Sequence, residues 1–278
     1  MNITLSLIVF LVGLCWGSFL NVVAHRFIHR INIFKPRSHC PSCNHTIFWY
    51  DNIPIFSWLL LRGKCRFCKA TISWLYPFTE LVTALITTLL FHKIMVKPYG
   101  LFDTDIAILK DALLADATQS FITYMIFVSA LIVASRTDLE SLLIPQLFTL
   151  WMIPVGFLAA YLRWISISVL QSISGALLGY GILWIIALVF KRCTGKDGLG
   201  VGDMELLAMI GSFLGPIGVW ISLAVGSLVG LFVGSIYLAL SGQDRATRIP
   251  FGPFLALGAL AYLLIGNKLT LFLLGTYL

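Results

Sequence analysis

The sequence predicts an all-α polytopic membrane protein, with about eight transmembrane helices and a small zinc-binding loop domain between the first two of them. Of its 278 residues, 59% are hydrophobic and 11% are charged, a composition too apolar for a soluble domain. Stretches of about twenty mainly apolar residues are long enough to cross a bilayer core roughly 30 Å thick as helices. A basic segment with two CxxC pairs separates the first two stretches.

The apolar stretches define the expected helices in chain order. They lie near residues 3–24, 76–96, 119–135, 142–162, 168–190, 203–215, 217–240 and 249–277. The first stretch has no basic region before it and no small-residue cleavage site after it. We therefore expect a retained helix and not a removed signal peptide.

Basic residues predict how these helices are oriented. Residues 25–75 hold eight Lys and Arg residues against one acid, Asp51. Because cytoplasmic loops carry an excess of Lys and Arg, we expect this segment in the cytoplasm and both termini outside. The segment at 97–118, with four Asp residues, is expected outside. The same bias explains most of the net charge of +7, so the expected partner is the lipid bilayer and not nucleic acid.

Four cysteines in the basic segment predict a metal site. They are written CPSC and CRFC, with twenty-one residues between the pairs: Cys40, Cys43, Cys65 and Cys68. Two CxxC pairs at this separation are typical of a tetrahedral four-thiolate zinc site. Two disulfides are the alternative, but cytoplasmic thiols are kept reduced. A closed site leaves no coordination position for water, so we expect the zinc to fold the loop and not to hydrolyse a substrate.

Few acids lie in or against the apolar stretches, and each needs a reason because charge is costly there. They are Glu80, Asp138, Glu140, Asp203 and Glu205. Asp138 follows the third helix and Asp203 opens the sixth, so the expected topology places both at the cytoplasmic boundary, where they can meet. Glu140 and Glu205 each lie two residues from an Asp, and positions i and i+2 of a helix do not face each other. A carboxylate pair is therefore expected across helices.

Such a pair predicts hydrolysis without a metal. When two carboxylates share one proton, one activates water and the other polarises the peptide carbonyl. In GLGVGD at 198–203, Gly200 and Gly202 have no Cβ, which would let an extended substrate approach Asp203 closely. On these residues alone, a proton or cation relay in a transporter explains two interfacial aspartates equally well.

Seven sequence blocks then point to a family. They are GSFLNVVAHR at 17–26, CPSC at 40–43, YDNIPIFSWLLLRGKCRFC at 50–68, YPFTELVTAL at 76–85, DLESLLIP at 138–145, GVGD at 200–203 and IPFGPFLALGAL at 249–260. In these blocks and their order, the chain resembles the type IV prepilin peptidases, the GxGD class of membrane aspartyl proteases. The resemblance runs nearly end to end.

The resemblance implies a site, two activities and a domain organisation. It places the catalytic aspartates at Asp138 and Asp203. It implies removal of the basic leader of type IV prepilins or type II secretion pseudopilins, typically after a glycine, at the cytoplasmic face of the bacterial inner membrane. It also implies methylation of the new N-terminus with S-adenosylmethionine. The expected parts are a first helix at 1–24, a zinc-binding loop with the methyltransferase part at 25–75, and a peptidase domain at 76–278.

Two positions depart from the family pattern. Glu205 stands where the family commonly has a basic residue, and Gln146 where it commonly has Asp; neither is a catalytic position.

The sequence does not locate the S-adenosylmethionine site, because the segment 25–75 has no Gly-rich nucleotide fingerprint. Candidates to bind S-adenosylmethionine are Arg26, Arg62 and Glu80, for which ordinary interfacial anchoring is the alternative.

Other functions stay open beside this one. A peptidase without methyl transfer has the same residues. A proton-coupled transporter would need a polar path through the bilayer midplane, whereas these acids cluster at one edge. A zinc-binding adaptor without catalysis leaves the aspartates without a role, and a protease that cuts within a membrane helix gives no reason for the cysteines.

Overall fold

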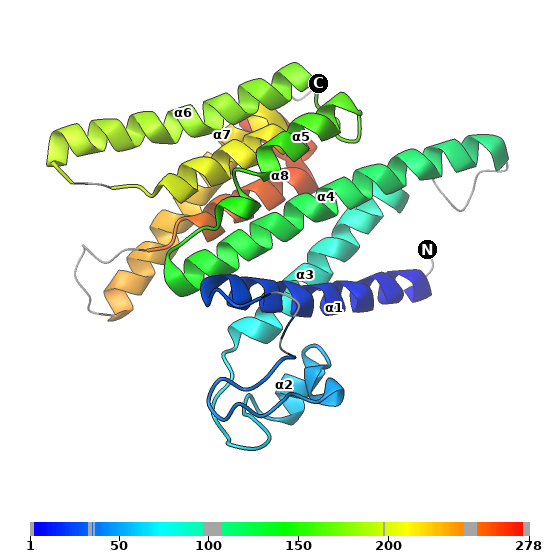
Figure 1. Cartoon of the computed structure of the whole chain (residues 1–278). Coiled ribbons are helices and arrows are strands. Elements are labelled where there is room, and N and C mark those ends of the chain that lie inside the picture. The colour runs from blue at the N-terminus through cyan, green and yellow to red at the C-terminus, as the bar shows by residue number, and fades with distance from the viewer. Residues whose placement is uncertain are drawn as a thin grey trace. The chain divides into compact units, whose positions relative to one another are not determined.

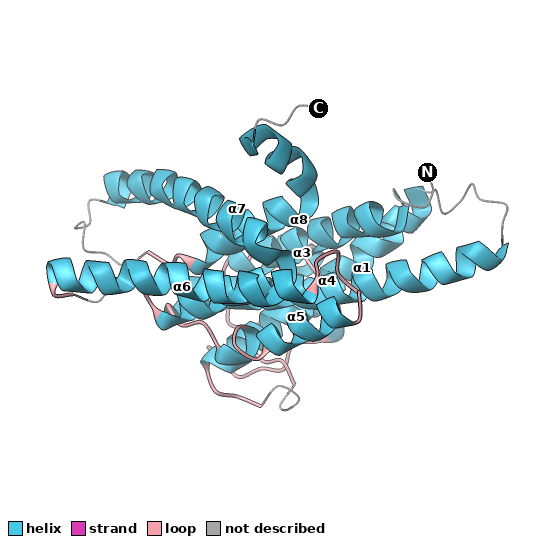
Figure 2. Cartoon of the chain, turned by 90° about the horizontal axis from the view of Figure 1, so that it is seen from above, coloured by secondary structure: helices cyan, strands magenta, loops and turns pink. Residues whose placement is uncertain are grey.

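The protein is described by a computed structural model that covers residues 3–32, 35, 37–96, 107–196, 198–241 and 249–274, without the side chains of 107–112, 241 and 267–274. The chain divides into two compact units, Met1–Lys110 and Asp111–Leu278. Within the described ranges every long element is a helix and no strand occurs (Figure 2), which confirms the expected all-α class. Parts of the expected external segment, 97–106, and the segment 242–248 lie outside this description.

The first unit is a helix pair with a cysteine-rich segment at one end (Figure 1). Its elements are α1 (Ile3–Ile28), the 3-10 turn η1 (Trp49–Asn52), α2 (Phe56–Leu60), α3 (Leu75–Phe91) and the π-helical turn η2 (His92–Val96). We call residues 37–74 the cysteine-rich segment. Helices α1 and α3 pack closely because Gly17 faces α3, where an added Cβ would lie 2.8 Å from Glu80 Cα.

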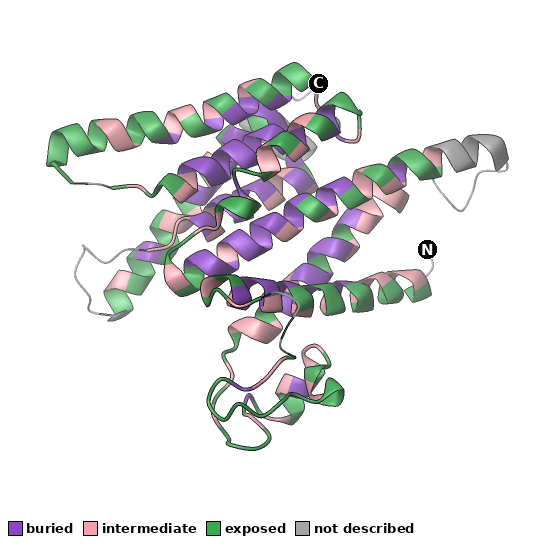
Figure 3. Cartoon of the chain, in the orientation of Figure 1, coloured by how far each residue is buried: buried purple, intermediate pink, exposed green. Residues whose placement is uncertain are grey.

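The second unit is a helical bundle arranged around α7. Its elements are α4 (Ala107–Ser141), whose first residues belong to the first unit, the 3-10 turn η3 (Gln146–Phe148), α5 (Met152–Tyr161), α6 (Val169–Thr194), α7 (Val201–Ser241) and α8 (Gly252–Leu274). Helix α7 packs against α5, α6 and α8. Buried residues gather on α4 and on the first part of α7 (Figure 3), where Phe127 and Phe213 stack with ring centroids 4.8 Å apart.

Helices occupy all eight of the expected apolar stretches. Among the described residues, five segments are long and apolar enough to cross a membrane: Ile3–Ile28, Leu75–Val96, Leu113–Ser141, Val169–Thr194 and Val201–Leu240. Two shorter apolar helices lie at Gln146–Tyr161 and Gly252–Gly266. The stretch expected at 142–162 is divided between η3 and the ten-residue α5, which is about 15 Å long, half the thickness of a bilayer core.

The sixth and seventh expected helices form one kinked element, α7. Gly215 interrupts it with φ 72° and ψ −176°, and Pro216 follows. Glycine adopts a positive φ without steric cost, and proline has no N–H for the helix ladder, so the break falls where these two residues meet. The expected division between 203–215 and 217–240 is thus present, and the first half of α7 carries Asp203.

Candidate functional site

Asp138 lies in the last turn of α4, which ends at Ser141. The chain turns sharply there: Leu142 has a φ of 55°, and its N–H donates to Asp138 O at 2.9 Å. The Asp138 side chain is buried, and its Oδ2 accepts a hydrogen bond from Gly252 N–H at 2.9 Å. Gly252 is the first residue of α8, so the carboxylate satisfies a free N–H group of a helix N-terminus, where negative charge is favoured.

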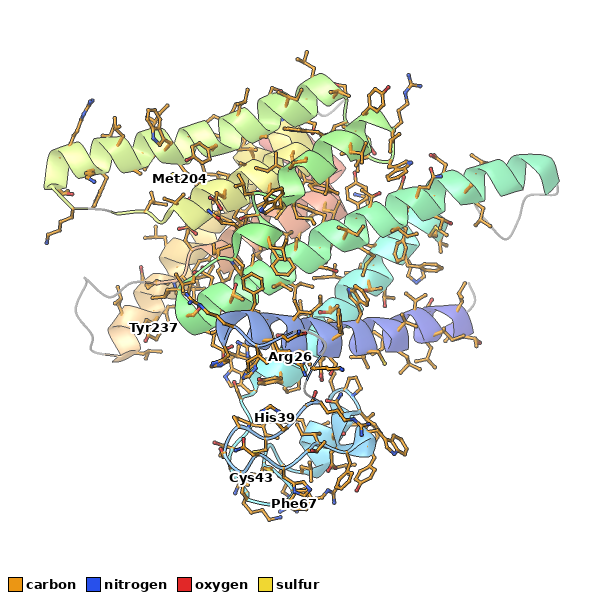
Figure 4. The ribbon with its side chains drawn as sticks, in the orientation of Figure 1. Arg26, His39, Cys43, Phe67, Met204 and Tyr237 are labelled. Atoms are coloured by element: carbon orange, nitrogen blue, oxygen red, sulfur yellow. The ribbon has the colours of Figure 1, made fainter. Side chains whose placement is uncertain are left out.

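Asp203 lies in the first turn of α7, directly before Met204, which Figure 4 labels. It is half-buried and accepts a hydrogen bond from the backbone N–H of Gly200. Its carboxylate lies near enough to that of Asp138 for the two groups to interact electrostatically. The structure therefore brings the two sequence-predicted aspartates together, from the end of one helix and the start of another.

Ile144 packs against the backbone segments that surround the Asp138–Asp203 pair. A Cβ on Gly202 would lie 3.0 Å from Ile144 Cβ, and one on Gly252 would lie 3.2 Å from Ile144 Cδ1. The loop after α4 thus packs against the starts of both α7 and α8. This contact favours glycine at 202, since a larger side chain would have to shift Ile144 or the start of α7 by a few tenths of an ångström.

Gly200 has different surroundings from Gly202. It is exposed, and a Cβ there would meet only Asp203 Oδ2 at 3.5 Å and Gly202 N at 4.0 Å among described atoms. The space beside Gly200 is therefore open next to a carboxylate. Of the two glycines, Gly200 has the surroundings that the close approach of a substrate backbone requires, whereas Gly202 serves packing.

The other acids at this edge have their own partners. Glu140 accepts from Arg136 Nη1 at 2.6 Å, one helical turn away. Glu205 is buried and accepts from Gln146 Nε2 at 3.1 Å and from Thr149 Oγ1 at 3.0 Å. Both glutamates are thus held by neighbouring side chains and do not join the aspartate pair.

The two positions that depart from the family pattern contact each other. Gln146 belongs to η3, just after Ile144, and Glu205 lies two residues after Asp203. Their hydrogen bond therefore joins the loop after α4 to the first turn of α7. The sequence showed each departure separately; it did not show that the two side chains meet, nor that Thr149 and Gly252 belong to the site.

The four cysteines of the first unit form one cluster. The Sγ atoms of Cys40, Cys43, Cys65 and Cys68 all lie within 4.8 Å of one another, and those of Cys40 and Cys68 are 3.8 Å apart. Thiolates around a tetrahedral zinc, with Zn–S bonds of about 2.3 Å, are about 3.8 Å apart. The cluster therefore fits one zinc ion. Figure 4 labels Cys43 within the cysteine-rich segment, near Phe67.

Each CxxC pair is built as the same backbone turn. In the first, Cys40 N–H donates to His45 O at 2.9 Å, and Asn44 N–H donates to Cys40 O at 2.8 Å. The equivalent bonds of Cys65 are 2.8 and 3.1 Å long. Asn44 and Lys69, which follow the second cysteine of each pair, both have a positive φ, at 57° and 60°. These turns point two thiols each toward a common centre.

The two thiols of the second turn have pKa values shifted in opposite directions: that of Cys68 is raised to about 11 by burial and by the neighbouring cysteine thiols. Backbone N–H groups of Cys68 and Phe67 lower the pKa of the Cys65 thiol to about 7. The thiolate is the form of cysteine that binds metals, so the backbone favours Cys65 as the first of the two ligands to lose its proton. Among the described residues, no histidine of the segment belongs to the cluster.

Two of the three candidates for S-adenosylmethionine binding line one cavity. This cavity, of about 310 Å³, lies in the first unit, and Arg26 and Glu80 are among its lining residues. Arg62, at the turn after α2 with a φ of 53°, is not.

A helical membrane protein with two aspartates at neighbouring helix ends and a separate four-thiolate cluster has the make-up of a membrane aspartyl peptidase. Comparison with family models agrees: residues 11–94 match the bacterial Peptidase A24 N-terminal domain, and residues 125–235 match the type IV leader peptidase family. The chain belongs to the type IV leader peptidase family, as its sequence blocks indicated.

Curated relatives cover nearly the whole chain. A prepilin leader peptidase/N-methyltransferase of Aeromonas hydrophila is 34% identical over 98% of this chain and 94% of the relative. A protein of the same description from Pseudomonas aeruginosa is 33% identical over 94% and 90%. A type 4 prepilin-like proteins leader peptide-processing enzyme of Escherichia coli is 34% identical over 90% of both chains. No solved structure matches the chain.

Proposed function

We propose that the protein removes the basic leader of type IV prepilins or type II secretion pseudopilins and N-methylates the new N-terminus with S-adenosylmethionine. The observation that carries the peptidase part is the pairing of Asp138 with Asp203, while Glu140 and Glu205 are held by other side chains. The N-methyltransferase activity and the prepilin substrate are proposed from the names of the relatives.

The chemistry follows from two carboxylates that share one proton. One carboxylate takes a proton from water as the water attacks the scissile carbonyl, and the other donates its proton to the carbonyl oxygen. As the tetrahedral intermediate collapses, a proton passes to the leaving amine. The pair as a whole performs both roles, because coupled carboxylates titrate together. The open space beside Gly200 suits an extended chain with a small residue at the cut, such as glycine.

In this proposal, both the zinc ion and S-adenosylmethionine bind to the first unit. Cys40, Cys43, Cys65 and Cys68 would hold one zinc ion, whose role is to fold the cysteine-rich segment, since four thiolates leave no position for water. The methyltransferase part would lie at 25–75 and the peptidase domain at 76–278. Because hydrolysis uses carboxylates, cleavage does not depend directly on the metal.

The proposed setting is the bacterial inner membrane. The five apolar helices support an integral membrane protein. The excess of Lys and Arg in 25–75 supports a cytoplasmic active site, with both termini outside. Pilin or pseudopilin precursors and the lipid bilayer are the expected partners, and nucleic acid is not.

The test is a two-product assay. Purified protein is mixed with a prepilin and S-adenosylmethionine, and the pilin is weighed by mass spectrometry. The proposal predicts loss of the leader mass and gain of one methyl group on the new N-terminus. An intact prepilin, in a protein that keeps its zinc and its helical content, would refute the peptidase function; a cut but unmethylated pilin would leave a cleavage-only peptidase.

A further inference from the structure

A cavity of the first unit is lined in part by buried polar residues. The cavity, of about 310 Å³, lies among the C-terminal half of α1, the start of α3 and the cysteine-rich segment. Its walls are mostly apolar and include Trp58 and Tyr76. Its polar lining includes Ser18, Asn21 and Glu80, which come from neighbouring turns of α1 and α3. A volume of this size accepts a small organic ligand.

Glu80 supplies a buried carboxylate to the lining of this cavity. It is 7% exposed, and its Oε2 accepts from Ile55 N–H at 2.7 Å. A hydrogen bond from Ser18 also reaches the carboxylate. These contacts fix the orientation of the group from three segments of the chain. A carboxyl group in a membrane-spanning helix is costly, and such residues generally serve binding or transport.

Asn21 supplies an acceptor without a partner. The residue is 2% exposed, and its Nδ2 donates to Tyr76 O at 3.0 Å. That bond fixes the amide, so Oδ1 is directed away from Tyr76, and among the described residues this oxygen has no hydrogen-bond donor. Leaving a buried acceptor unpaired is unfavourable. The geometry therefore indicates a donor that comes from a ligand.

The two acceptors together define the chemistry of that ligand. A carboxylate and an amide oxygen in the lining of one cavity suit an ammonium group, which is positively charged and carries several donors. Arg26, which is buried and donates to Asn32 O at 2.9 Å, brings positive charge to the same cavity. Apolar and aromatic walls suit a flat ring system. A molecule with an amino-acid end and a heterocyclic end combines these features.

We propose that this cavity binds S-adenosylmethionine, with Glu80 and Asn21 receiving the ammonium group of its methionyl part. The inference rests on the proposed methyl-transfer function, and it gives that function a location that the sequence did not. Because α1, α3 and the cysteine-rich segment each supply a wall of this cavity, the methyltransferase part would then extend beyond 25–75 on both sides.

The test measures binding and not turnover. Full-length, zinc-loaded protein is titrated with S-adenosylmethionine and with 5′-methylthioadenosine, which lacks the amino-acid part. Glu80→Gln keeps the shape of the side chain and removes its charge, and Asn21→Leu removes the amide oxygen. Loss of a charge-assisted contact predicts that Glu80→Gln weakens S-adenosylmethionine binding about tenfold to hundredfold. Binding of methylthioadenosine should change less than about threefold, because Glu80 and Asn21 contact only the amino-acid part.

Controls separate this inference from the proposed function. Glu140→Gln removes a carboxylate outside the cavity and should leave both affinities unchanged; zinc content and helical content verify folding of every variant. If Asn21→Leu fails to fold, Glu80→Gln alone decides. Unchanged binding in a folded Glu80→Gln, with wild type that binds and methylates, would overturn the location and keep the proposed function. Wild type that neither binds nor methylates would overturn both.

Discussion

Glu205 links the two segments that contain Asp138 and Asp203. Its removal should therefore lower both the stability of the protein and the rate of leader cleavage. Glu205→Ala leaves Gln146 Nε2 and Thr149 Oγ1 without their acceptor, and Thr149 is fully buried. Each hydrogen bond to a charged group contributes about 1.5–3 kcal/mol, which gives a gross loss of about 3–6 kcal/mol. Removing a buried carboxylate also removes its desolvation cost, which offsets part of this loss. We expect a net loss of about 2–3 kcal/mol in the free energy of unfolding.

The same change should loosen the start of α7 against the loop that contains Ile144. Because small displacements of catalytic groups are costly in rate, we expect kcat for leader cleavage to fall about tenfold or more. Glu205→Gln is the matched control: it keeps the volume and one oxygen acceptor, and should keep most of the activity. Equilibrium unfolding in mixed micelles and a prepilin cleavage assay measure the two effects. An alanine variant as stable and as active as wild type would refute the role given to this contact.

Three further predictions concern metal, loop and topology. Purified protein should carry about one zinc ion per chain, and chelator should not block cleavage directly; rapid loss of cleavage while the cysteine-rich segment stays folded would indicate a catalytic metal. Replacing Cys40 and Cys43 with Ser removes half of the ligands, and because structural zinc supplies roughly 10 kcal/mol or more of folding energy in isolated zinc peptides, methyl transfer should be lost while cleavage is at least partly retained. A double variant that methylates normally would show another role for the segment. Reporter fusions after Lys69 should report the cytoplasm and fusions near Asp105 the exterior, and an external signal after Lys69 would invert the topology.

The sequence predicted those parts of the site that depend on local patterns. The CxxC spacing predicts two thiols on one turn, and both turns form the same hydrogen bonds. The pairing of Asp138 with Asp203 was predicted because i and i+2 neighbours on a helix cannot face each other and because both residues lie at one predicted membrane edge. The break in α7 follows from Gly215 and Pro216, whose backbone preferences act locally.

Contacts between distant residues could not be predicted in this way. Gln146 and Glu205 are 59 positions apart, and one sequence does not show which polar side chains meet. Gly252 contacts Asp138 through its backbone N–H, a group that every residue except proline has and that therefore leaves no signal. The shortness of α5 also depends on tertiary structure, since the residues before it turn back to reach Glu205.

The central claim is that Asp138 and Asp203 together cleave the leader, and single substitutions test it most directly. Asp138→Asn and Asp203→Asn keep the size of each side chain and remove its charge. Each variant is incubated with a prepilin and, separately, with a pre-cut pilin and S-adenosylmethionine, and both products are followed by mass spectrometry. Each variant is expected to leave the prepilin uncut, and Asp203→Asn is expected to methylate the pre-cut pilin. Full cleavage by Asp203→Asn would contradict the mechanism.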